Sequence, residues 1–239
     1  MARRRPPFAL RSAWLEINLV QLGRNVSVLQ DHAARTSVRP PALLCVVKDD
    51  AFGHGAVEVS QMALAHGVGY LAVAAVGEAI ELRRAGIAAP ILVFGERDPA
   101  ELPACLRHDL TVAVNDARIP TELSRLASAS GLTAKIHLKI STGMNRYGVA
   151  AADAACLAHQ LTALPGIALE GVFSHFAMSD AADPAFSHEQ LATFRGALGD
   201  LEHCGLRPPL RHLCNSGGFL NFPEAHFDLV RLGLLPLGL

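Results

Sequence analysis

Short apolar runs rich in β-branched residues recur along the chain, and most are separated by stretches with helical periodicity. The runs cover residues 42–47, 70–75, 91–94, 110–114, 135–140, 168–174, 211–214 and 228–234. Helices are predicted over residues 54–66, 77–86, 98–107, 117–130, 151–163 and 186–204, and Asn18 can cap a further helix that runs to about residue 34. This alternation is typical of parallel strands joined by helical crossovers.

Eight strands with crossovers in 239 residues predict a (β/α)8 barrel, the TIM barrel of the α/β class. An open doubly wound sheet is the alternative. The two commonest phosphate loops of open sheets, G-x-G-x-x-G after the first strand and G-x-x-x-x-G-K-[ST], are both absent. We expect a flexible N-terminal extension over residues 1–12 and one barrel domain over residues 13–239.

Charge and composition narrow the class of partner. The formal net charge is −1 with 51% apolar residues, so the sequence offers no basic footprint for nucleic acid. Arg11 and Glu16 interrupt a secretion signal, and the uncharged run at 68–77 is about half the length of a membrane span. Five singly spaced cysteines disfavour disulfides and a metal site. A cytoplasmic protein that binds a small molecule is expected.

Polar residues and glycines gather where the apolar runs end. In a barrel, the loops after all strands meet at one face, and function collects there. Each residue alone is weak support, because a lysine at a strand end is usually a solvated rim residue and N-S-G-G is usually a turn. Their joint position is more informative. The set consists of Lys48, Lys139, Arg146, His175, Asn215, Ser216, Arg231, Gly233 and Leu234.

These residue types fit pyridoxal 5'-phosphate. A lysine among apolar neighbours favours its neutral amine, which can form a Schiff base with an aldehyde. Glycines at 217–218 and 233 allow backbone N–H groups to converge on a phosphate. Arg231, if it reaches the ring nitrogen, keeps that nitrogen unprotonated because a guanidinium does not give up its proton. A weak electron sink of this kind favours deprotonation and reprotonation of the substrate over transamination.

Several motifs resemble those of the alanine racemases. V-V-K-D-D-A-F-G-H-G is similar to that family's V-V-K-A-x-A-Y-G-H-G, and the likeness continues in the family's order through H-L-K-I-S-T-G-M-N-R-Y-G, G-V-F-S-H-F-A, C-N-S-G-G and V-R-L-G. The resemblance implies a racemase that converts L-alanine to D-alanine for peptidoglycan, acting on a small amino acid with pyridoxal phosphate as cofactor.

The resemblance also implies roles for single residues. Lys48 would form the Schiff base and accept the proton on the D-face. Lys139 would be carbamylated and would orient Arg146 near the substrate carboxylate. His175, the third residue expected to be catalytic beside Lys48 and Arg146, packs on the cofactor ring. The remaining roles concern the cofactor: His212 supports Arg231 at the ring nitrogen, Ser216, Gly233 and Leu234 lie at the phosphate, and Asn215 is part of the cofactor site.

Four differences from the family pattern lower the expected catalytic power. Phe52 and Leu237 stand where the family has tyrosines, and the tyrosine at position 52 would contact the phosphate. Ser141 stands where the family motif K-x-D-T-G has its aspartate. The family's second, β-rich domain, which supplies the proton acceptor of the L-face across a homodimer interface, is expected to be missing. Residues 14–17 alternate like a strand of that domain.

Two other functions stay open. A non-catalytic barrel that carries pyridoxal phosphate is the main alternative, although its usual motifs do not match. A decarboxylase built on the same barrel would need an acidic partner for the ring nitrogen, where this sequence has Arg231.

Overall fold

The computed structural model describes residues 15–239. The flexible extension expected at residues 1–12 lies outside the described residues, and so does Trp14 of the expected extra strand. Residues 15–18 are not part of any strand. An isolated strand has no ladder of hydrogen bonds to hold it.

Eight parallel strands form the barrel predicted from the apolar runs. Their order is β8-β7-β5-β4-β3-β2-β1-β9, and every ladder between neighbours is parallel. The ring closes between β8 and β9, where Asp228 N donates to Arg211 O and Arg231 N donates to Cys214 O, both at 3.0 Å. The open-sheet alternative is therefore wrong. The strands are β1 (Ala42–Val46), β2 (Tyr70–Val73), β3 (Ile91–Val93), β4 (Thr111–Val114), β5 (Ala134–Ser141), β7 (Ile167–Phe173), β8 (Leu210–His212) and β9 (Leu229–Leu232).

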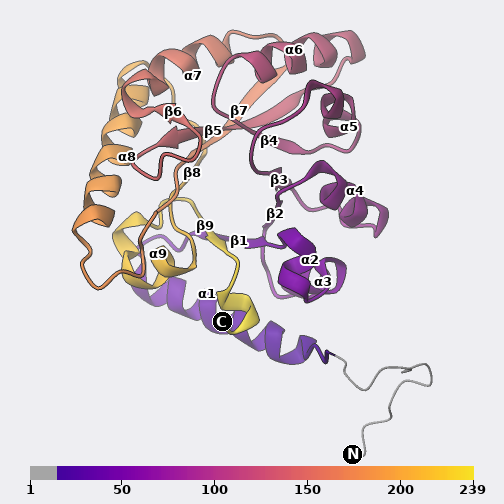
Figure 1. The fold of residues 1–239 in the computed structure, drawn as a ribbon, viewed down its shortest axis with the longest axis vertical. Helices are drawn as coiled ribbons and strands as arrows, with labels where there is room; N and C mark the ends of the chain where they lie inside the picture. The colour runs from indigo at the N-terminus through magenta and orange to yellow at the C-terminus, as the bar shows by residue number, and fades with distance from the viewer. Residues whose placement is uncertain (1–14) are drawn as a thin grey trace, which may run out of the picture.

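Helices surround the strands, as Figure 1 shows. The predicted helices are present with ends shifted by a few residues, and two begin with a 3-10 turn. They are α1 (Leu19–Thr36), α3 (Ala56–Ala65), α4 (Val76–Arg84), η1 (Pro99–Glu101) with α5 (Leu102–Arg107), α6 (Arg118–Ser130), η2 (Ala151–Asp153) with α7 (Ala154–Thr162), and α8 (Ala185–His203).

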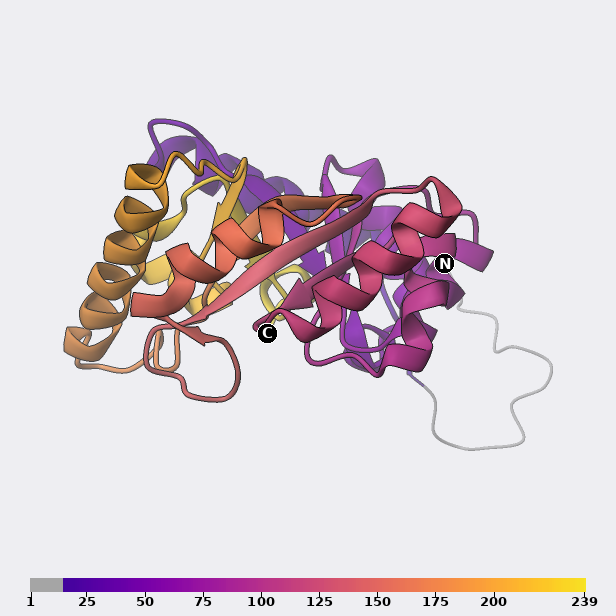
Figure 2. The ribbon, with the colours of Figure 1, turned by 90° about the horizontal axis from the view of Figure 1, so that it is seen from above.

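Several short elements were not predicted. The strand β6 (Val149–Ala150) pairs with the end of β5, and the loop that carries it projects from that end in Figure 2. These elements have six residues or fewer, which is too short for a helical or strand period to show in the sequence. The others are α2 (Lys48–Gly53), α9 (Ser216–Asn221), η3 (Pro223–Ala225) and η4 (Leu235–Leu237).

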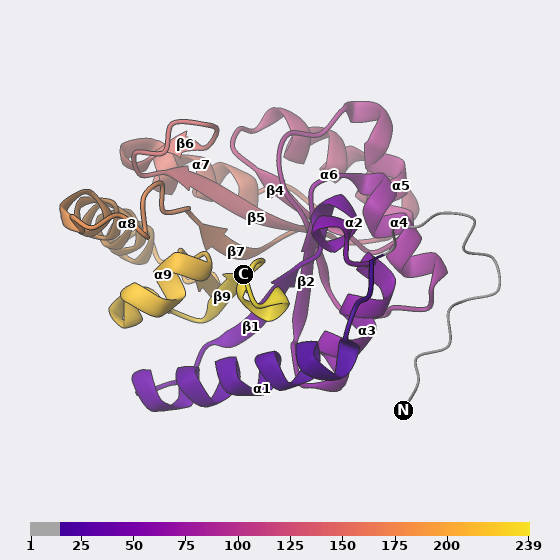
Figure 3. The same cartoon turned by 60° about the horizontal axis from the view of Figure 1, so that its bottom comes forward.

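The first helix joins the two ends of the described chain. Asn18 caps α1 as predicted, because its side chain accepts a hydrogen bond from Gln21 N at 3.0 Å. Asn25 on α1 donates to Pro236 O at 3.1 Å, and Figure 3 shows the C-terminal segment beside this helix. The helix thus completes the outer ring from the N-terminal side.

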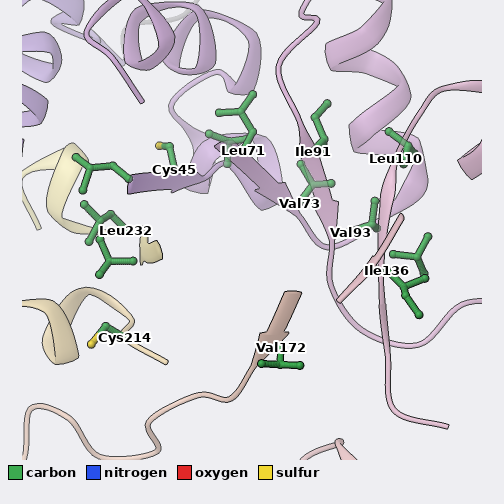
Figure 4. Close-up of a cluster of buried hydrophobic side chains, with 14 of the residues drawn as sticks. Cys45, Leu71, Val73, Ile91, Val93, Leu110, Ile136, Val172, Cys214 and Leu232 are labelled. Carbon is green, nitrogen blue, oxygen red and sulfur yellow. The ribbon is translucent and has the colours of Figure 1, made fainter. Parts of the chain in front are cut away.

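The strands are apolar on both faces. Alternate side chains point outward against the helices, and Figure 4 shows this outer layer around Leu71, Val73, Ile91 and Val93. The others fill the barrel, where Leu44, Ala72, Leu92, Ala113 and Phe173 pack together. Burial of both faces is normal for parallel strands with helical crossovers, and it explains why the runs were recognisable.

Other sequence expectations have mixed outcomes. Three cysteines are buried, but Cys156 and Cys204 are exposed rather than part of the core. Within residues 15–239, no helix is long and apolar enough to cross a bilayer. No group of three or more histidine, cysteine or acidic side chains in that range could hold a metal ion.

Candidate active site

The reactive-lysine motif forms a left-handed turn at the end of β1. Residues Asp49 to Phe52 have φ between 51° and 55° and ψ between 37° and 48°, a conformation that costs about 1–2 kcal/mol per non-glycine residue. Two carboxylates hold the turn: Glu78 accepts from Asp49 N at 2.6 Å, and Asp50 accepts from Ala56 N at 2.7 Å. The turn stops the strand abruptly and leaves Lys48 at its tip.

Lys48 is partly exposed and has an acidic neighbour. Its Nζ donates to Asp49 Oδ2 at 2.7 Å and lies 5.4 Å from the centre of the Phe52 ring. The sequence predicts apolar neighbours for this amine, and the carboxylate of Asp49 is a neighbour of another kind.

A cavity of about 650 Å³ opens at the C-terminal ends of the strands. The amine of Lys48 and the guanidinium of Arg231 both line it, so the two groups share one mouth of the barrel. All nine residues singled out from the sequence lie in its wall: Lys48, Lys139, Arg146, His175, Asn215, Ser216, Arg231, Gly233 and Leu234.

Arg231 is buried on the cavity floor, and both terminal nitrogens of its guanidinium have hydrogen-bond partners. Its NH1 donates to His212 Nδ1 at 2.9 Å, and its NH2 lies within 2.9–3.0 Å of Ser174 O, His175 Nδ1 and Leu213 O. Burial lowers the pKa of the guanidinium to about 10, so it stays charged at neutral pH. It is therefore a fixed donor.

The two histidines beside Arg231 are neutral. A guanidinium only donates, so both Nδ1 atoms must be acceptors. Burial, and after it the charge of Arg231, lowers the pKa of His175 to about 2 and that of His212 well below its usual range. Phe173 stacks on His212 with ring centres 4.8 Å apart and planes at 1°, which holds the imidazole flat.

Lys139 is the second lysine of the cavity and has no acidic partner in its hydrogen bonding. It is 2% exposed, its Nζ donates to Ile140 O at 3.0 Å, and the Tyr147 ring centre is 5.5 Å away. Burial, then the charges of Arg231 and Arg146, lowers the pKa of Lys139 to about 7. A large share of this amine is therefore uncharged near neutral pH.

The opposite wall is lined with backbone donors. The N–H groups of Gly233 and Leu234 both lie 3.3 Å from Ser216 Oγ, which is long for a hydrogen bond. Asn215 Oδ1 accepts from Gly218 N at 2.9 Å. A Cβ on Gly233 would lie 3.2 Å from the Phe52 ring, so the glycine leaves room at this point. The arrangement fits an anion such as a phosphate.

The sequence reasoning missed several cavity residues. Phe173 and Tyr147 lie in the wall, and their rings face the ammonium of Lys139. Strand alternation could have found Phe173, since it points to the same side as His175, two residues later. No pattern indicated Tyr147. Of the replaced tyrosines, Phe52 lines the cavity, whereas Leu237 is part of η4 and packs against the core.

Fold and site together define a class: (β/α)8 barrels with an amine, a buried arginine and an anion cradle at one mouth. The family model "Alanine racemase, N-terminal domain" matches residues 17–239. The chain belongs to the alanine racemase family.

Individual alanine racemases are similar to this chain along most of its length. Alanine racemases of Symbiobacterium thermophilum and Desulfovibrio desulfuricans are 39% and 38% identical over 96% of this chain, which covers 60% and 61% of their lengths. The crystal structure of alanine racemase from Bacillus anthracis with bound L-Ala-P superposes with a TM-score of 0.89 at 33% identity, over 98% of this chain and 59% of that one.

Two facts follow from these comparisons. The chain spans about 60% of the length of the curated relatives it matches. Proteins of this family depend on pyridoxal phosphate, and the amine, the fixed arginine and the cradle described above fit that cofactor. The non-catalytic carrier and the decarboxylase are not favoured by the family match.

Proposed function

We propose that this chain is the cofactor-binding barrel of an alanine racemase, the part that holds pyridoxal phosphate and removes the α-proton on one face of the substrate. The observation that carries the proposal is the shared cavity of Lys48 and Arg231. An amine can form the Schiff base, and a guanidinium that keeps the ring nitrogen unprotonated favours plain proton exchange over transamination.

Each residue has a proposed role. Bound pyridoxal phosphate supplies an aldehyde and a ring that withdraws electrons from the substrate α-carbon. Lys48 Nζ would hold the aldehyde and later accept the α-proton. Arg231 would donate to the ring nitrogen without losing its own proton. His175 would lie against the ring. Asn215, Ser216, Gly233 and Leu234 would hold the phosphate.

Arg146 would hold the substrate carboxylate, and Lys139 would orient Arg146. We propose that the neutral amine of Lys139 adds carbon dioxide, forming an N–C bond and releasing one proton, so that an anionic carbamate results. Its lowered pKa and its position near the charges of Arg146 and Arg231 support this. The anion would offset both positive charges and orient Arg146.

The whole protein would act as a homodimer in the cytoplasm and supply D-alanine for peptidoglycan. In this proposal, residues 13–239 are the barrel domain, and a second, β-rich domain supplies the proton acceptor for the opposite face. Racemisation needs one acceptor on each face of the α-carbon, so we expect the barrel alone to turn over slowly or not at all.

Borohydride reduction after addition of pyridoxal phosphate tests the proposal. The chain has three lysines, so peptide mass spectrometry can assign the reduced adduct without ambiguity. We expect the adduct on Lys48, its loss in Lys48→Ala, and no change in Lys135→Ala, a matched control whose amine binds Asp109 outside the cavity. An adduct spread evenly over the lysines would refute the assignment.

A further inference from the structure

A row of polar side chains, buried except for the half-buried glutamate at its end, crosses the barrel interior below the cavity. It begins at Arg231, passes through His212 and His137, and ends at Glu170. Successive separations are 2.9 Å from Arg231 NH1 to His212 Nδ1, 2.9 Å from His212 Nε2 to His137 Nδ1, and 3.4 Å from His137 Nε2 to Glu170 Oε2. Both imidazoles are 0% exposed. The function proposed above uses only the Arg231 end.

The direction of every contact in this row follows from Arg231. Since the guanidinium can only donate, His212 Nδ1 accepts, and the single proton of that neutral ring is on Nε2. This N–H therefore donates to His137 Nδ1. By the same reasoning the proton of His137 is on Nε2, which faces the Glu170 carboxylate. All donors thus point from the arginine to the glutamate.

Burial and charge support this assignment. Burial lowers the pKa of His137 and of His212, so each ring carries one proton rather than two. Contact with His137, and hydrogen bonds from Tyr70 and Thr111, lower the pKa of Glu170 to about 2. His137 Nε2 has no hydrogen-bond partner within good geometry among the described residues. The carboxylate 3.4 Å away is thus the acceptor this N–H faces.

The backbone is shaped to aim the Glu170 carboxylate at His137. Ile136 on β5 pairs with Leu169 on β7, but the next residue, His137, pairs with Gly171. Glu170 is therefore the extra residue of a β-bulge, a feature that re-aims a side chain. A Cβ on Gly171 would lie 2.8 Å from the His137 ring. The bulge and the glycine together make room for the imidazole and its acidic neighbour.

We propose that Glu170 is a positioning residue for Arg231: by accepting from His137 it holds that ring, and through it His212, in the orientation in which His212 receives the guanidinium. The inference deepens the proposed function, since it rests on Arg231 acting at the cofactor ring. It explains how Arg231 stays in place although no carboxylate is among its hydrogen-bond partners. A carboxylate in direct contact would offset the charge of the guanidinium.

Nitrogen NMR of the ring-labelled chain without cofactor tests the assignment directly. Protonated and unprotonated imidazole nitrogens have well separated shifts, and His137→Asn and His212→Asn identify the two signals. We expect both rings to be protonated at Nε2. A proton on Nδ1 of either ring in the unsubstituted chain would overturn the proposal, whatever the variants do.

Three glutamate variants test the cause. In Glu170→Leu the Nε2 proton of His137 has no acceptor, so we expect the ring to turn away and to break its contacts with His212 and, through it, with Arg231. The Nε2 tautomer at His137 and the His212 signal position should then both be lost. In Glu170→Gln the amide oxygen can still accept, so both tautomers should be kept. Glu122→Leu, which removes an exposed carboxylate bonded to Arg125, is the control and should change neither.

The proposal is wrong if a folded Glu170→Leu chain, checked by circular dichroism, keeps both tautomers. If this variant does not fold, the spectra of Glu170→Gln and of the unsubstituted chain still test the proposal. Loss of the tautomers in Glu170→Gln would contradict it, because the amide oxygen can still accept from His137. None of these spectra involves pyridoxal phosphate. Failure to find the Lys48 adduct would therefore not affect the tautomer result, and a failed tautomer prediction would not affect the adduct result.

Discussion

Lys48 and Asp49 form an ion pair between adjacent residues, with Nζ 2.7 Å from Oδ2 and side chains 38% and 62% exposed. The family motif has alanine where this chain has Asp49. The pair must break before the amine can react with an aldehyde. An exposed pair is worth about 0–1 kcal/mol, so its effect on cofactor affinity is limited.

Asp49→Asn should raise the affinity for pyridoxal phosphate by up to about fivefold, which corresponds to about 1 kcal/mol. Asparagine tolerates the left-handed φ of 54° at this position, so the turn is kept and only the charge is lost. Absorbance titration measures the dissociation constant. An unchanged or lower affinity would show that the pair does not oppose cofactor binding.

Phe52→Tyr should strengthen the binding of the phosphate. The ring of Phe52 lies against Gly233 at the cradle, and a hydrogen bond to a charged group is worth about 1.5–3 kcal/mol. We expect roughly tenfold or greater affinity for pyridoxal phosphate. Pyridoxal without its phosphate is the control ligand, and an equal gain for both would exclude a contact between the new hydroxyl and the phosphate.

Lys139 should make the protein less stable as the pH falls. Its pKa is about 7 in the folded chain against 10.5 for an ordinary lysine, so between these values the unfolded chain binds the extra proton. Stability therefore rises with pH in that window, by at most about 1.4 kcal/mol per pH unit. Denaturation of Lys139→Met in buffer free of carbon dioxide should lack this slope. Parallel curves for the two proteins would contradict it.

His175 should contribute to acid sensitivity. With a folded pKa of about 2 against 6.5 for an ordinary histidine, the unfolded chain takes up a proton first, and stability falls as the pH drops below about 6.5. His175→Asn keeps an acceptor for Arg231 but removes the titrating group. The slope of its unfolding free energy against pH should therefore be shallower by up to about 1.4 kcal/mol per pH unit. His159→Asn on the exposed side of α7 should behave like the unsubstituted chain in urea denaturation.

The barrel and the cavity wall could be predicted because the buried strands form regular apolar runs. The residues where these runs end were therefore recognisable. Lys48 and Arg231 each end a buried strand, and parallel strands bring such ends together. Family motifs added roles that no pattern gives. The placement of these two groups at one cavity confirms the spatial prediction, whereas their chemical roles stay predictions.

Other parts depended on packing that a sequence does not display. The bulge at Glu170 shifts the register of β7 by one residue, and nothing in the apolar alternation marks it. The turn after Lys48 is left-handed over four residues, and two of them, Ala51 and Phe52, ordinarily avoid this conformation, so local preference does not predict it. The carboxylates of Asp50 and of Glu78, the latter 29 residues after Asp49, hold it in place.

The left-handed turn also limits how such a protein can be diversified. A saturation library across positions 49–52 should be depleted in valine, isoleucine, threonine and proline, because their side chains clash with the backbone at a φ near +50°. Glycine, asparagine and aspartate should survive selection. New substrate preferences would then have to arise in the loops after the other strands, while the segment beside the reactive amine stays nearly constant.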